Sequence, residues 1–123
     1  MEFDSFSKRV IGCALEVHRE LGPGLLESAY EACLAHELTE AGVTFQRQCP
    51  LPVVYKAVRV DCGYRADLVV EGQLVVELKT VEQLLPIHEA QLLSYMKLAH
   101  VSVGLLINFN VRLLKDGLKR MVL

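Results

Sequence analysis

The sequence has no apolar run that approaches the ~20 residues of a membrane-spanning helix. Its first ten residues, MEFDSFSKRV, are acidic and polar before any apolar run, so no secretory signal is expected. These two absences predict a cytoplasmic protein that has no membrane partner. Internal repeats, linkers and low-complexity segments are also lacking, so residues 1–123 are expected to form one domain with a real core.

Positive charge is scarce, because 13 Lys and Arg residues stand against 15 Asp and Glu residues. The net charge of -2 therefore lacks the bulk positive character that is typical of nucleic-acid-binding proteins. Residues 1–42 hold eight acids and three bases, whereas residues 43–123 hold seven acids and ten bases. The C-terminal segment contributes Arg112, Lys115, Lys119 and Arg120 against Asp116. A local basic surface and an evenly mixed exterior both remain open.

Closely spaced cysteine pairs are absent, since Cys13, Cys33, Cys49 and Cys62 form no CxxC motif. Cys13 and Cys33 fall within apolar helical patterns, so small core side chains are the expected role. A zinc site or a disulfide is the alternative. Reduced thiols fit the cytoplasm.

Apolar residues at helical spacing predict two helices in the first third of the chain. Ser5 is the expected cap of the first helix, which runs to Leu21 and ends at the Gly-Pro-Gly stretch 22–24. The second helix is expected over 25–41, with Gly42 as its stop. The apolar positions are Phe6, Val10, Cys13, Val17 and Leu21 in the first helix, and Leu26, Tyr30, Cys33, Leu34, Leu38 and Ala41 in the second.

From Val43 onward the pattern changes to that of strands. Strands are expected at 43–48, 51–55, 58–62, 64–70, 73–79 and 101–109, with a last edge strand at 117–123. Pro50 and Pro52 indicate a break or a sheet edge, and Pro86 suits the first turn of a helix that reaches Ala99. The order of elements predicts an α/β (α+β) fold in which α-helices flank a mixed central β-sheet.

Three charged residues, Asp67, Glu77 and Lys79, interrupt apolar strands, where charges are seldom buried without a partner or an ion. If the two strands pair through a short turn at 71–72, Val70 faces Gln73 or Leu74, so Asp67 lies near Glu77 and both carboxylates point to one place. Like charges so close repel each other, so a divalent cation such as Mg²⁺ is a natural partner. An ion-pair network in which Lys79 neutralises both acids is the open alternative.

The helices add two groups of polar residues. Gly24, Glu27 and Tyr30 recur at intervals of three, and Glu27 lies in a first helical turn, where the dipole alone favours a carboxylate. In the later helix, His88, Gln91 and Tyr95 are spaced i, i+3 and i+7 and share one stripe. This stripe reaches the acidic site or is simply the solvated face. His88, beside Glu89, is the weaker candidate and is more typical of a surface residue.

Four stretches in order resemble the PD-(D/E)xK nuclease superfamily: GPGLLESAYE, GYRADLVV, VVELK and HEAQLLSYMK. More narrowly, the chain is similar to the small bacterial GxxExxY proteins, which are named for the spacing seen at Gly24, Glu27 and Tyr30. The resemblance runs from about Val10 to the C-terminus. One departure is Ala66, which stands where the superfamily name has proline.

The resemblance implies a restriction-endonuclease-like core and a set of site residues. Lys79 would be the catalytic lysine, and Gln91 and Tyr95 would fill an accessory position. One or two Mg²⁺ or Mn²⁺ ions would lie at Asp67, Glu77 and the Leu78 carbonyl, with Glu27 bound directly or through water. The expected catalytic residues are therefore Glu27, Asp67, Glu77, Lys79, Gln91 and Tyr95.

These observations predict a nuclease that depends on Mg²⁺ or Mn²⁺ and hydrolyses phosphodiester bonds in nucleic acid, with DNA as the expected substrate. A homodimer is expected, because one small core must reach two strands to make a double-strand cut. One alternative is a binding or assembly module that kept the fold and lost turnover. The apolar residues Val111, Leu113 and Leu114 would then serve an interface, although they equally suit a core. Another alternative is a metal-dependent phosphatase that acts on small nucleotides.

Overall fold

The computed structural model of the chain describes residues 4–123. The elements are α1 (Ser5–Leu21), α2 (Glu27–Glu40), β1 (Phe45–Pro50), β2 (Val53–Tyr55), β3 (Val58–Val60), β4 (Arg65–Val70), β5 (Leu74–Lys79), α3 (Pro86–Ala99), β6 (Val103–Asn108), the short 3-10 helix η1 (Leu114–Gly117) and β7 (Leu118–Val122). Among these described elements, no helix is both long and apolar enough to cross a membrane.

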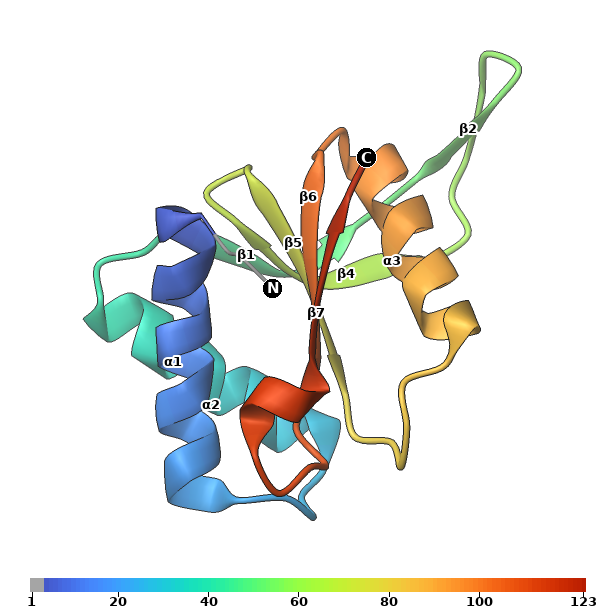
Figure 1. Cartoon of the computed structure of the whole chain (residues 1–123). Coiled ribbons are helices and arrows are strands. Elements are labelled where there is room, and N and C mark those ends of the chain that lie inside the picture. Colours follow the sequence, from blue (N-terminus) through green and yellow to red (C-terminus); the bar gives the residue numbers. More distant parts are fainter. Residues whose placement is uncertain (1–3) are drawn as a thin grey trace.

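A five-stranded sheet in the order β1-β4-β5-β6-β7 forms the centre of the molecule. β5 and β6 run parallel and are connected through α3, whereas every other neighbouring pair is antiparallel. Helices α1 and α2 lie on one side of this sheet and α3 lies on the other (Figure 1). The predicted fold class, a mixed sheet flanked by helices, is therefore confirmed.

The two faces of the sheet carry separate apolar cores. On one face, Leu68, Val76 and Leu78 pack with the buried sides of α1 and α2. On the other face, Val75 and Leu106 pack with Leu92 and Met96 of α3. Because side chains alternate along a strand, β5 contributes to both cores in turn, and this explains its nearly continuous apolar sequence.

The helix starts differ in detail from the sequence-based predictions. Asp4, not Ser5, caps α1, because its Oδ1 accepts a hydrogen bond of 2.7 Å from the Ser7 backbone N–H. Leu26 precedes α2 and is 76% exposed, so its assignment to the apolar stripe was wrong. The first residue of α2 is Glu27.

Strands β2 and β3 pair only with each other and form a hairpin outside the main sheet. Lys56 and Ala57 form its turn with positive φ angles of 47° and 68°. The hairpin projects away from the body of the molecule beside α3 (Figure 1), and its side chains, including Tyr55, are largely exposed. The sequence predicted both strands but did not predict that they leave the main sheet.

The C-terminal segment belongs mainly to the core. Leu114 is buried, and Val111 packs against the same apolar cluster, whereas Leu113 remains exposed. Strand β7 forms the predicted last edge strand. Its charges are partly paired, because Arg120 contacts Asp4 at 3.2 Å and Lys119 contacts Glu89 at 3.8 Å. These contacts reduce the basic surface that the sequence left open.

We expect Gly117→Ala to destabilise this segment. A Cβ atom at residue 117 would lie 2.2 Å from the Asn108 carbonyl oxygen and 3.1 Å from Val111 Cγ2. Backbone must shift to relieve such overlap, at a cost of about 1–3 kcal/mol. Thermal unfolding of Gly12→Ala supplies the control, because the added methyl group meets nothing within 4 Å and Ala favours the helix. A Gly117→Ala variant as stable as the wild type would contradict this packing.

Candidate active site

The strand register brings Asp67 and Glu77 to opposite positions on β4 and β5. Val70 pairs with Leu74 and Leu68 pairs with Val76, where the paired ladder ends, so Asp67 and Glu77 are the next residues on the two strands. A tight turn enforces this register, because Glu71 and Gly72 both have positive φ. The structure therefore places the two carboxylates side by side, as the sequence predicted.

At this position the carboxylates replace the backbone ladder. The Asp67 N–H donates to Glu77 Oε1 at 2.9 Å, and the Leu78 N–H donates to Asp67 Oδ2 at 2.8 Å. Each acid is thus held by the backbone of the opposite strand. Ala66 packs in the core on the α3 side although Leu68 packs in the other core, so β4 twists at Asp67.

Electrostatics at this place favour a cation. Burial, followed by the negative charge of Asp67, raises the pKa of Glu77 from 4.5 to about 8. The pKa values of Asp67 and Glu27 are also raised, in both cases chiefly by burial. The charge of Lys79 lowers the pKa of all three carboxyl groups but does not cancel the rise that burial causes. A bound cation would favour their ionised forms.

The loop before α2 positions Glu27. Tyr30 is fully buried, donates its hydroxyl to the Gly22 carbonyl at 2.6 Å and accepts the Leu25 N–H at 3.1 Å. Its ring stacks on Phe109 with a centroid distance of 4.5 Å. Tyr30 therefore fixes the loop, and the loop sets where α2 begins. In the Gly24–Glu27–Tyr30 motif, Glu27 is therefore an acid near the site, whereas Tyr30 has a structural role.

Lys79 lies on the same side of β5 as Glu77, two residues further along. Its Nζ donates to Gln91 Oε1 at 2.8 Å, and Gln91 Nε2 donates to the Tyr95 hydroxyl at 3.3 Å. Among the ion pairs of residues 4–123, none involves Lys79. Lys79 therefore makes no direct ion pair with Asp67 or Glu77, although its charge lowers the pKa of both acids. An amide holds the ammonium group instead.

If the site carries out the phosphodiester hydrolysis that the sequence predicts, Gln91→Ala should lower kcat by about 10–100-fold, because the ammonium group of Lys79 loses its fixed position. Steady-state kinetics measure kcat. Gln83→Ala is the control, because Gln83 is exposed and precedes α3. An unchanged kcat would show that Lys79 needs no such support.

His88 has a structural role. Its Nδ1 accepts the Leu85 N–H at 2.9 Å, which caps the start of α3. Two residues of the predicted stripe reach Lys79, because Gln91 bonds to Lys79 and Tyr95 bonds to Gln91. His88 does not, since its hydrogen bond is to Leu85 at the start of α3.

Sequence reasoning missed two groups beside the acids. Glu31 is buried, one turn beyond Glu27, and binds Arg47 at 3.1 Å and Gln48 at 2.6 Å. Gln48 also donates to Asp67 Oδ1 at 3.3 Å, and its φ of 49° turns β1 at this point. The i, i+4 spacing of Glu27 and Glu31 was the available signal. Nothing local in the sequence marked Gln48.

A third missed residue, Asn108, fixes the chain after β5. Its side chain donates to the Val81 carbonyl at 2.8 Å and accepts the Val81 N–H at 3.1 Å. Because Asn108 pairs with Lys79 in the parallel register, this amide holds the segment that follows the lysine.

The donor set fits a hard divalent cation. Asp67 and Glu77 supply carboxylate oxygens, the Leu78 carbonyl lies between Glu77 and Lys79 in sequence, and Glu27 adds a further acid nearby. Mg²⁺ commonly uses one or two carboxylates and keeps several waters. Within residues 4–123, no three His, Cys, Asp or Glu side chains form a ready-made cage. Water or a substrate phosphate would have to complete the coordination.

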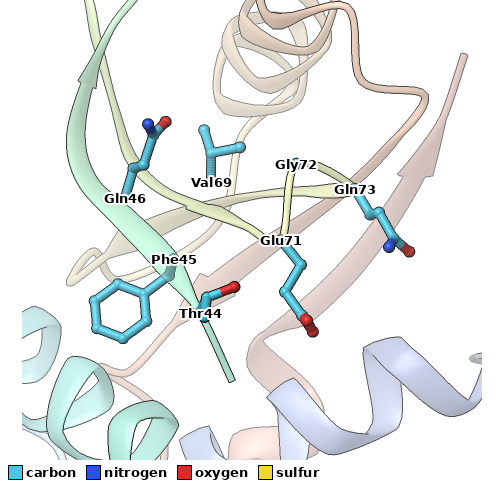
Figure 2. Close-up of a pocket in the computed structure, with 7 residues that line it drawn as sticks. All are labelled: Thr44, Phe45, Gln46, Val69, Glu71, Gly72 and Gln73. Atoms are coloured by element: carbon cyan, nitrogen blue, oxygen red, sulfur yellow. The ribbon is translucent and has the colours of Figure 1, made fainter. Parts of the chain in front are cut away.

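Another cavity lies at the turn end of the same strands. It has a volume of 510 Å³ and is lined by Thr44, Phe45, Gln46, Val69, Glu71, Gly72 and Gln73. Figure 2 shows that Phe45 and Glu71 project away from its Gln46–Val69 side. It contains one acid and none of the predicted site residues, so it is separate from the acidic site.

Two carboxylates and a lysine on adjacent strands of a mixed, helix-flanked sheet define a nuclease-like α/β protein. The family model of the PD-(D/E)XK nuclease superfamily matches residues 4–121, and the chain belongs to this superfamily. Comparison with curated proteins and with solved structures gives no match. Nucleases of this superfamily generally use divalent metals, and membership implies nucleic-acid binding.

Proposed function

We propose that the protein is a nuclease that depends on Mg²⁺ or Mn²⁺ and hydrolyses phosphodiester bonds, with DNA as its substrate. The observation that carries this proposal is the cross-strand bonding of Asp67 and Glu77, whose carboxylates are each fixed by the opposite backbone. Neither acid has a salt-bridge partner among residues 4–123, so both remain available to a cation. Superfamily membership supports the same reaction class.

The residues divide into three roles. Asp67 and Glu77 would hold the cation together with the Leu78 carbonyl and Glu27. When bound, that cation lowers the pKa of a bound water and neutralises charge on the phosphate. Lys79 orients the attacking water and stabilises charge that develops on phosphorus. Gln91 and Tyr95 position the Lys79 ammonium group through their serial hydrogen bonds.

The Gly24–Glu27–Tyr30 spacing supports assignment to the GxxExxY proteins. A homodimer remains part of the proposal, since one site acts on one strand. A cytoplasmic location is supported by the four cysteines, which are all present as free thiols.

A cleavage panel tests the proposal. Single-stranded DNA, duplex DNA, branched DNA and RNA are each incubated with Mg²⁺, with Mn²⁺ or with a chelator, using wild type and Asp67→Asn. We expect cleavage of at least one DNA substrate that requires the metal and is lost in the variant. If wild type is inert on every substrate and metal leaves its melting temperature unchanged, the non-catalytic assembly module is the better account. Phosphate release from mononucleotides alone would support the phosphatase.

A further inference from the structure

A groove adjoins the candidate active site on the side of α3. Its volume is 440 Å³, and its lining is mainly apolar. Gln91 and Tyr95 belong both to this groove and to the chain of hydrogen bonds that holds Lys79. The lining residues are Val53, Tyr64, Gln91, Ser94, Tyr95, Lys97 and Leu98. None of Glu27, Asp67, Glu77 and Lys79 lines it, so the groove lies beside the candidate active site, and Val53 of β2 borders it.

Two aromatic rings dominate the groove. The centroids of Tyr64 and Tyr95 lie 6.1 Å apart, and the ring planes are inclined at 53°. Tyr64 is 47% exposed although it precedes β4 directly, so part of its ring is left without a protein partner. Val53 and Leu98 add aliphatic surface. Such a site suits a flat, aromatic ligand that stacks on one ring and contacts the other.

The charge around the groove suits a ligand that carries phosphates. Lys97 of α3 lines the groove itself. Tyr64 also lines a second cavity of 300 Å³, where Arg59 and Arg65 are found, although Arg59 is paired with Asp61 at 3.3 Å. Residues 50–65 hold three bases and one acid, opposite in sign to the whole chain. Tyr64 thus belongs to a basic segment and lies against Tyr95, which Gln91 links to Lys79 by hydrogen bonds.

We infer that this groove binds an unpaired nucleobase next to the scissile phosphate, and that the substrate is a strand with at least one unpaired nucleotide. The inference rests on the proposed nuclease function. A base inside a duplex is stacked on its neighbours and cannot offer its face to a protein ring. A free strand can place a base on Tyr64 while its backbone continues to the basic segment.

The inference is tested by binding without turnover, in a Lys79→Ala background with Mg²⁺ present. Fluorescent single-stranded and fully paired DNA oligonucleotides are titrated with this protein and with added Tyr64→Ala. Loss of one stacking ring should weaken single-strand binding by about 10-fold, whereas duplex binding should stay unchanged. Tyr55→Ala is the matched control, because Tyr55 is also an exposed tyrosine but lies at the hairpin tip outside the groove. Tyr64→Phe should retain binding.

Each outcome separates this inference from the proposed function. If wild type cleaves but Tyr64→Ala binds single strands as tightly as its parent, only the groove inference is overturned. If nothing is cleaved but Tyr64→Ala still loses single-strand affinity, the groove assignment holds and the nuclease proposal falls. Equal affinity for a mononucleotide and for the oligonucleotide would overturn the assignment to a strand. Absence of any oligonucleotide binding, together with a wild type that cleaves nothing, would overturn both.

Discussion

Replacing Lys79 by Ala should lower the rate of phosphodiester cleavage by about 10²–10⁴-fold. The ammonium group of Lys79 is fixed on the same side of β5 as Glu77, through its 2.8 Å bond to Gln91 Oε1. Its loss removes a charge that acts on the attacking water and on the phosphate. The fold should survive, because Lys79 lies at the end of β5, is partly exposed and makes no ion pair within residues 4–123.

Single-turnover cleavage in Mg²⁺ measures this effect, and thermal unfolding verifies the fold. Lys115→Ala is the control, since Lys115 is an exposed lysine of η1. The Lys79→Ala variant should lose cleavage rate but keep the rise in melting temperature on addition of Mg²⁺, because the carboxylates that hold the metal are unchanged. A Lys79→Ala variant that cleaves at the wild-type rate would remove the lysine from the proposed chemistry.

Replacing Glu77 by Gln should stabilise the metal-free protein above pH 8, by about 1–3 kcal/mol. The folded-state pKa of Glu77, about 8, lies above its ordinary value of 4.5, so the native state holds a proton that the unfolded state has released. Wild-type stability should therefore fall as pH rises from about 4.5 to 8 and then level off. The glutamine side chain of the variant carries no charge at any pH, so the variant should lose much of this decline.

Unfolding of metal-free protein at several pH values between 4 and 9 measures the effect. Glu71→Gln is the matched control, because Glu71 lies in the same hairpin but is exposed in its turn. Addition of Mg²⁺ at pH 8 should make the wild type more stable than Glu77→Gln. The cation stabilises the wild type by binding to its folded state, whereas the variant lacks one of the metal ligands. A Glu77→Gln variant with the wild-type pH profile would show that this carboxyl group is not held in an unfavourable ionised state.

The sequence alone was sufficient for the features that depend on local spacing. The alternation of side chains and the short turn that begins at Glu71–Gly72 place Asp67 near Glu77, and the structure sets the exact register with a turn of residues 71–73. Helical spacing in the same way placed Gln91 and Tyr95 on one stripe, where they do bond to each other. A strand or a helix has a fixed repeat, so neighbours within one element or across one tight turn follow from counting.

Tertiary structure decided the contacts between distant segments. Gln48 joins Glu31 to Asp67, and Asn108 holds the chain after Lys79, although no local pattern relates these positions. Tertiary packing also decided that Leu26 is exposed and that the β2–β3 hairpin lies outside the main sheet. Such contacts depend on how helices and strands pack in three dimensions, and the repeat of a single element carries no information about its distant partners.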